Sequence, residues 1–142
     1  MDKNWSTLKK DDKLYLMIPY MENNIIKYEF QESQVINVHH YECCTNIRFK
    51  YTDKNYNRRR RIELCVNKYK YELEYVSSNK ETGWAKDNNY QYGDLIITYL
   101  NPEILNKVYD ELIDNKIKEQ EELIKSQKEY IEKLKLLKND NI

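Results

Sequence analysis

The hydrophobic pattern of the chain changes once, near residue 100, and this change constrains the fold more than any other feature. Across 1–100, apolar residues alternate with polar ones, as they do on strands that place one face on a core. Across 102–138, apolar residues recur at helical spacing instead. The order of the two patterns predicts an α+β protein, with a β-rich part followed by a long amphipathic helix.

Several short segments carry the alternation, and a loop is predicted at 77–94, which holds both glycines. Because Thr52–Asn57 is turn-forming, we expect the strands on its two sides to form a hairpin. Serial antiparallel strands favour a small barrel or a strongly bent sheet of about five to seven strands, which also hides the sheet edges. The predicted strands are 14–18, 26–30, 35–41, 47–51, 60–66, 69–75 and 95–100.

The C-terminal helix has a clear predicted start. Asn101 suits the N-cap, and Pro102 suits the first helical position, where a missing N–H leaves no bond unmade. We therefore divide the chain into a β-rich domain, 1–100, and a C-terminal helix, 101–142. A break near Asp114–Asn115, giving two shorter helices that fold back, is the competing geometry.

The second half of the helix also fits a heptad repeat, the pattern of coiled coils. Gln120 and Gln127 at successive d positions weaken a simple two-stranded coiled coil, because buried amides need partners. Leu123, Tyr130 and Leu137 widen the stripe, as in helices that pack on their own domain or in a bundle. A homo-oligomer built through this helix stays an alternative, and its candidate contact residues are Ile113, Ile117, Ile124, Ile131 and Leu134.

Composition excludes several classes of function. The 24 basic and 24 acidic residues give zero net charge, so no overall charge attracts nucleic acid or a membrane. With only two glycines, the chain cannot build a Walker loop or a dinucleotide-binding turn. It also shows neither a signal peptide nor a membrane-spanning segment. We therefore expect a cytoplasmic protein, with its three cysteines reduced.

One local concentration of charge contrasts with this neutral background. Residues 48–70 contain nine basic and two acidic residues, and they include all five arginines of the chain. Basic side chains neutralise phosphates, and interleaved tyrosines can stack on bases. In the alternative interpretation, this hairpin is only solvated and its arginines pair with Glu72, Glu74 or the acidic C-terminal helix. The predicted contacts to a protein, nucleoprotein or nucleic acid are Arg48, Lys50, Lys54, Tyr56, Arg58, Arg59, Arg60, Arg61, Lys68 and Lys70.

His39, His40, Cys43 and Cys44 are residue types that bind metals or act in nucleophilic catalysis. On a strand, His40 and Cys44 would face one side, and His39 and Cys43 the other. Structural zinc sites usually use separated pairs such as C-x₂-C, a spacing that is absent here. A Cys–His nucleophilic centre needs an activated thiolate, and no sequence signature supports one. We therefore predict no metal, cofactor or catalytic residue, and keep both sites as alternatives.

Both ends of the β-rich region resemble known small proteins. Trp5–Tyr15 is similar to the first strand of small SH3-like barrels, and Tyr92–Glu103 looks like the last strand and helix start of such domains in phage-encoded proteins. The resemblance implies an origin in a phage or mobile element of an AT-rich host, and it implies no activity. In that setting the partner would be a host nucleoprotein, such as a defence complex, or a viral structural component.

Two functional hypotheses follow. In the first, a non-enzymatic binding protein uses the basic hairpin to engage its partner, for example as an inhibitor of host defence. In the second, the protein is a structural or assembly protein whose C-terminal helix drives oligomerisation, and the hairpin only aids solubility.

Overall fold

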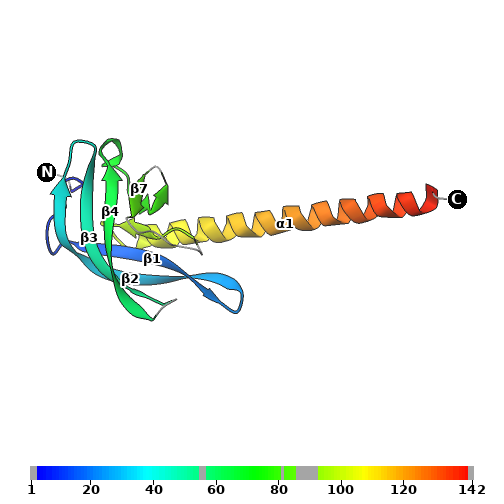
Figure 1. The fold of residues 1–142 in the computed structure, drawn as a ribbon, viewed down its shortest axis with the longest axis horizontal. Helices are drawn as coiled ribbons and strands as arrows, with labels where there is room; N and C mark the ends of the chain where they lie inside the picture. The colour runs from blue at the N-terminus through cyan, green and yellow to red at the C-terminus, as the bar shows by residue number, and fades with distance from the viewer. Residues whose placement is uncertain (1–2, 55–56, 81, 86–92, 141–142) are drawn as a thin grey trace. The chain divides into compact units, whose positions relative to one another are not determined.

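The structure, a computed structural model, describes residues 3–54, 57–80, 82–85 and 93–140 (Figure 1). The chain divides into two compact units, Met1–Asn106 and Lys107–Ile142. The first unit is built around an antiparallel sheet, and the second continues a long C-terminal helix. This confirms the predicted α+β class, with a barrel-like sheet followed by one helix. The predicted contact Tyr56 and the part of the predicted loop at 86–92 lie outside the described residues.

Within the described residues the sheet has eight strands in the order β5-β8-β1-β2-β3-β4-β7-β6. All neighbouring strands are antiparallel, and six of them have three residues or more, in agreement with the predicted number. The strands are β1 (Lys13–Glu22), β2 (Ile25–His40), β3 (Cys44–Asp53), β4 (Arg58–Asn67), β5 (Val76–Ser77), β6 (Asn79–Lys80), β7 (Gly83–Ala85) and β8 (Ile96–Thr98).

Ser78 brings the two edges of the sheet together. It is the single residue between β5 at one edge and β6 at the other. Its N–H donates to the carbonyl of Leu95 at 3.0 Å, and its carbonyl accepts from the N–H of Ala85 at 3.0 Å. The sheet therefore curls into a nearly closed barrel, which leaves little unpaired edge for other chains to join.

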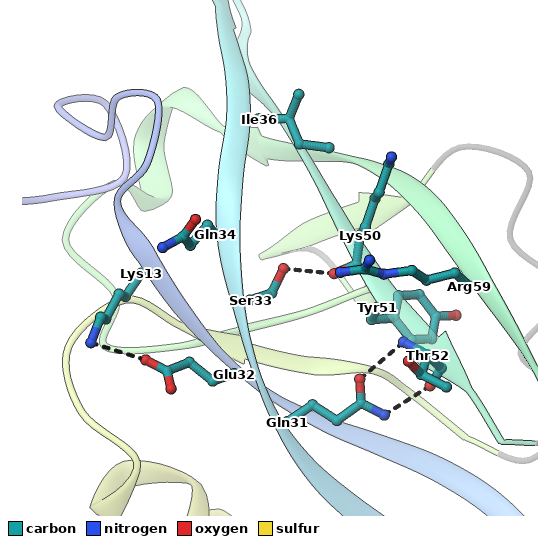
Figure 2. A pocket seen from close by; sticks show the side chains of 10 residues that line it. All are labelled: Lys13, Gln31, Glu32, Ser33, Gln34, Ile36, Lys50, Tyr51, Thr52 and Arg59. Carbon is teal, nitrogen blue, oxygen red and sulfur yellow. Dashed lines mark hydrogen bonds and ion pairs between the residues drawn. The ribbon is translucent and has the colours of Figure 1, made fainter.

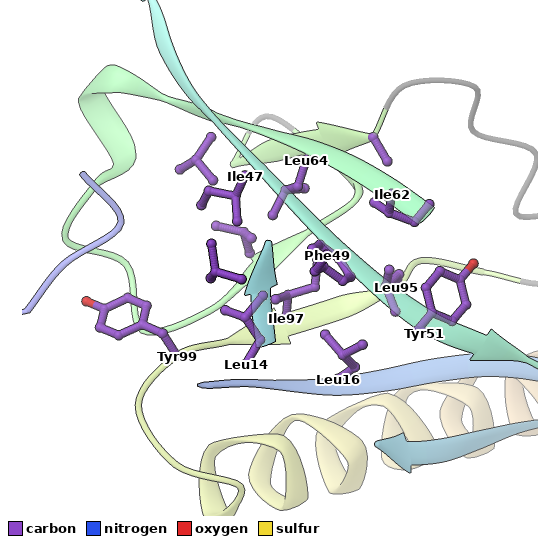
Figure 3. Packing of buried hydrophobic residues seen from close by; sticks show 14 of the residues in the cluster. Leu14, Leu16, Ile47, Phe49, Tyr51, Ile62, Leu64, Leu95, Ile97 and Tyr99 are labelled. Carbon is purple, nitrogen blue, oxygen red and sulfur yellow. The ribbon is translucent and has the colours of Figure 1, made fainter. Parts of the chain in front are cut away.

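The interior of the barrel is filled by side chains that alternate with outward ones along the strands (Figure 3). Trp5, which precedes β1, belongs to the same buried cluster. The fully buried strand residues in it include Leu14, Leu16, Ile47, Phe49, Leu64 and Ile97.

β2 is one strand of 16 residues, where the sequence predicted two at 26–30 and 35–41. Its first part pairs with β1 as far as Gln34, and its last part pairs with β3 from Val35 onward. The register shifts between Val35 and Asn37, as in a bulge, which bends a strand. β2 thus stops pairing with β1 where it begins to pair with β3. The bend at this point opens the groove described below.

Residues 69–75 do not form the predicted strand. A 3-10 helix, η1 (Lys68–Lys70), follows β4, and the Asn67 side chain caps it by accepting from the Tyr69 N–H at 2.9 Å. The carbonyl of Leu73 then accepts from the indole N–H of Trp5 at 2.7 Å, and that of Tyr71 accepts from the Trp5 backbone N–H at 3.3 Å. The backbone of this segment holds Trp5 in place. The alternation of tyrosines with charged residues therefore did not indicate a strand here.

The C-terminal helix, α1 (Glu103–Asp140), has 38 residues. It continues through Asp114 and Asn115, so the competing geometry of two shorter helices does not occur. The Asn101 side chain accepts from the Ile104 N–H at 3.3 Å, as predicted for the N-cap. The first turn of α1 belongs to the first compact unit, so the division falls after Asn106 and not at residue 100. The described helices include none long and apolar enough to cross a membrane.

Candidate functional site

The predicted binding residues do not form one surface. Lys68 and Lys70 lie in η1, at the opposite end of β4 from Arg58. Because a strand rises about 3.4 Å per residue, they lie about 30 Å from Arg58. Lys54, near the hairpin turn, places its Nζ 4.3 Å from the ring centre of Tyr20 in a cation–π contact. The charge that the sequence concentrates in one segment is therefore distributed along the full length of the hairpin.

Two of the predicted arginines form ion pairs within the hairpin. Arg60 Nη1 lies 3.0 Å from Oδ2 of Asp53, whose side chain is only 4% exposed. Arg48 Nε lies 3.4 Å from Oε2 of Glu63, and the other oxygen of Glu63 accepts from the Asn46 amide at 2.6 Å. These two arginines thus pair internally, but their partners are Asp53 and Glu63 and not the carboxylates that the alternative interpretation named.

Three other cations, Lys50, Arg59 and Arg61, lie on the outward face of the hairpin. The register places Lys50 opposite Arg61, and Arg59 opposite Thr52, and all four residues are exposed. Among the described residues, none of the three cations forms an ion pair. Like charges directly opposite each other on a sheet are destabilising. The arrangement therefore does not serve the stability of the hairpin.

A groove opens beside these cations, where β2 and β3 separate. The pairing of the two strands begins at Val35 and Phe49, and the earlier residues of β2 pair with β1 instead. The groove encloses about 560 Å³. It is lined by Lys13, Gln31, Glu32, Ser33, Gln34, Ile36, Lys50, Tyr51, Thr52 and Arg59 (Figure 2).

Two side chains of β2 bridge the separated strands at the groove. Ser33 Oγ donates to the carbonyl of Lys50 at 2.6 Å. Gln31 donates from Nε2 to the carbonyl of Thr52 at 2.8 Å, and its Oε1 accepts from the Thr52 N–H at 3.0 Å. The Gln31 amide thus pairs with Thr52 as a neighbouring strand would. These bonds give partners to the Lys50 and Thr52 carbonyls and to the Thr52 N–H, and they fix the backbone that carries Lys50.

The groove carries a net positive charge. Glu32 pairs with Lys13, whose Nζ lies 3.2 Å from its Oε1, while Lys50 and Arg59 form no ion pair among the described residues. Figure 2 shows the Lys13–Glu32 pair on one side of β2 and the other two cations on the opposite side. Lysine and arginine bind carboxylates and phosphates through charge-assisted hydrogen bonds. The groove can therefore hold an anionic group.

Sequence reasoning identified the cations but missed the β2 residues that complete the groove. Gln31, Glu32, Ser33 and Gln34 are ordinary strand residues by type. The available signal was that all four are polar, whereas a strand with a face on the core has an apolar residue at every second position. That β2 leaves β3 at Val35 depends on closure of the barrel, which no local pattern shows.

The cluster of histidines and cysteines lies at a turn. The expectation that it lies along one strand was wrong. His39 and His40 end β2, Cys44 begins β3, and the Tyr41 N–H donates to the carbonyl of Cys44 at 2.9 Å to close the turn. His40 Nδ1 lies 3.3 Å from the hydroxyl of Thr45. Within the described residues, no three His, Cys, Asp or Glu side chains are placed to hold a metal ion.

The thiol of Cys43 does not have the environment of an activated nucleophile. Its hydrogen bond to the Cys44 sulfur, at 3.7 Å between the two Sγ atoms, raises the pKa of Cys43 above its usual value, and charge interaction with Cys44 and burial raise it further. An activated thiol needs the opposite shift. The structure thus lends no support to a Cys–His catalytic centre.

Labelling of the native protein with iodoacetamide tests this environment. Cys43 is exposed, whereas Cys44 and Cys65 are buried, so we expect modification at Cys43 first. Because only the thiolate reacts, the raised pKa of Cys43 should make labelling near pH 7.5 slower than that of free cysteine, with the midpoint of the rate profile at higher pH. The Cys43→Ser variant is the control. Faster labelling than that of free cysteine would contradict the raised pKa of Cys43.

Comparisons of the chain with protein-family models, curated proteins and solved structures found no match. The resemblance to small phage-encoded proteins stays a prediction, and the functional proposal below rests on the geometry of the groove and its cations.

Proposed function

We propose that this is a non-enzymatic binding protein that holds an acidic segment of a partner protein against the outer face of the β3–β4 hairpin and the adjoining groove. The observation that carries the proposal is the cluster of Lys50, Arg59 and Arg61. These side chains are exposed, lie on one face and form no ion pair among the described residues. Bringing carboxylates to this face would relieve the repulsion between Lys50 and Arg61.

Two observations favour an acidic protein segment over nucleic acid. Proteins that hold single strands usually present aromatic side chains for stacking, but Tyr51, the aromatic residue in the groove lining, is only 2% exposed. Tyr69 is 88% exposed, but it lies in η1 at the other end of β4. In addition, the zero net charge of the chain gives no general attraction to a polyanion. In the phage setting that the resemblance implies, the partner would be an acidic face of a host protein or nucleoprotein, and binding would inhibit it.

The test compares two double variants that each remove two charges from the same segment. Lys50→Gln/Arg61→Gln removes the opposed pair on the outward face, and Lys68→Gln/Lys70→Gln is the matched control in η1. The probe is a fluorescent peptide rich in Asp and Glu, titrated at low salt and followed by anisotropy. We expect about tenfold weaker binding for the first variant, because two charge-assisted contacts are lost, and a change of less than about threefold for the control.

An oligonucleotide with the same number of charges as the peptide distinguishes the two classes of partner. We expect the wild-type protein to prefer the peptide, and its affinity to fall as salt screens the exposed charges. If both double variants weakened peptide binding equally, the outward face would have no specific role in binding. A preference for the oligonucleotide would replace the acidic protein segment with nucleic acid.

A further inference from the structure

The second compact unit carries an exposed apolar stripe. From residue 117 onward, seven large apolar side chains of α1 recur at heptad positions a, d and g, and each is between 46% and 64% exposed. Stripes of this length on a soluble helix mark an interaction surface. The seven residues are Ile117, Leu123, Ile124, Tyr130, Ile131, Leu134 and Leu137.

The charges beside this stripe change sign half-way along it. Position e is acidic at Asp114 and Glu121, and basic at Lys128 and Lys135. The opposite flank, position g, holds the apolar residues Leu123, Tyr130 and Leu137 from residue 123 onward. One flank of the stripe is therefore charged and reverses its sign, and the other flank is apolar.

We propose that the occupant of this stripe is a second copy of the chain, with the two α1 helices packed antiparallel in a symmetric dimer. In an antiparallel pair, e residues meet e residues and g residues meet g residues. The acidic half of each charged flank then lies against the basic half of the other, and the apolar flanks cover each other. Because the interface is two-fold symmetric, every contact occurs twice.

One register sets opposite charges against each other and pairs apolar residues in part, with each glutamine of the seam opposite an isoleucine. It sets Ile117 opposite Leu134 of the second copy, and Ile124 opposite Gln127. The helices then overlap from about residue 113 to residue 138, which is about 39 Å of helix. On the apolar flank, Leu123 meets Tyr130 of the second copy. Leu137, the third apolar residue of this flank, lies opposite Lys116 of the second copy.

In the same register, Glu121 lies opposite Lys128 of the second copy, and Asp114 lies opposite Lys135. Lys135 also pairs with Glu132 on its own helix at 3.3 Å, but both side chains are more than 60% exposed in the single chain, so this pair can be exchanged or shared. Moving the register by one heptad in either direction would set Glu121 against itself or Lys128 against itself. Like charges at such positions disfavour both shifts.

A parallel pair does not use the same pattern. In parallel coiled coils, each e residue faces a g residue of the other helix. Lys128 would then face Leu123, and Lys135 would face Tyr130, so neither lysine would meet a carboxylate. The separation of one charged flank from one apolar flank therefore selects the antiparallel arrangement. This inference is independent of the anion-binding groove.

A charge-exchange experiment on the full chain tests both the dimer and its direction. The dissociation constant is measured by analytical ultracentrifugation from about 1 μM to about 1 mM. We expect a dimer that is weakened at least tenfold by Glu121→Lys or by Lys128→Glu, because each substitution opposes like charges twice. The double variant Glu121→Lys/Lys128→Glu should return to within about threefold of wild type. Glu122→Lys, one residue along at position f, is the matched control, and circular dichroism checks that helix content is kept.

Each other outcome overturns the proposal. A monomer throughout the concentration range would show that no second copy covers the stripe. A dimer that the double variant fails to restore would have another direction or register, because only the antiparallel arrangement sets positions 121 and 128 against each other. A larger assembly would exclude the two-fold pair.

Discussion

Replacing Trp5 by alanine is expected to lower the free energy of unfolding of the β unit by about 4 kcal/mol. Trp5 is fully buried, and its ring meets that of Tyr99 edge to face, with centroids 4.9 Å apart at 88°. Its indole N–H donates to the carbonyl of Leu73 at 2.7 Å. Alanine would leave a large cavity and remove the donor from that carbonyl, and both effects destabilise the native state. Urea denaturation followed by far-ultraviolet circular dichroism measures the change.

The other tryptophan supplies a matched control. Trp84 lies on β7 and is 51% exposed, so Trp84→Ala should change the free energy of unfolding by less than about 1 kcal/mol. Trp5→Phe keeps most of the buried ring but loses the indole donor, and we expect about 2 kcal/mol of destabilisation. Equal effects of the two alanine variants would contradict the position of Trp5 in the core.

The sequence predicted the strands that place one face on the core. β3 and β4 were found because apolar residues such as Phe49 and Leu64 alternate with outward polar ones, and β1 was found because Leu14, Leu16 and Ile18 recur at every second position. The same rule failed at 69–75, where the tyrosines alternate with charges but the backbone bonds to Trp5. Alternation reports which faces are apolar, and it does not show whether a neighbouring strand is present to pair with.

The candidate site was predictable only in part, for a similar reason. Counting back from the inward Ile62 places Arg60 on the inner face and Arg59 and Arg61 on the outer one, so alternation could have separated the paired arginine from the exposed ones. The groove could not be predicted from the sequence, because it lies where β2 stops pairing with β1 and begins to pair with β3. That change of partner depends on contacts between segments far apart in the chain.

Replacing Arg60 by glutamine is expected to lower the free energy of unfolding by about 2–3 kcal/mol. The loss of Arg60 would leave the 4% exposed side chain of Asp53 without the guanidinium that lies 3.0 Å away. Removing one partner of a buried ion pair destabilises a protein because the remaining charge stays buried with less compensation. Arg59→Gln, one residue earlier on the exposed face, should change the free energy by less than about 0.5 kcal/mol. Urea denaturation of both variants under the same conditions makes the comparison.

The difference between these two arginines decides how binding experiments on the hairpin must be designed. A variant that neutralises Arg58–Arg61 together would lose the Asp53 pair as well as the exposed charges, so weaker binding could come from a loosened hairpin turn. Substitution at Lys50 and Arg61 leaves that pair in place and changes only outward side chains. Equal destabilisation by Arg60→Gln and Arg59→Gln would show that the pair with Asp53 adds nothing to stability, and the four arginines could then be treated as one surface.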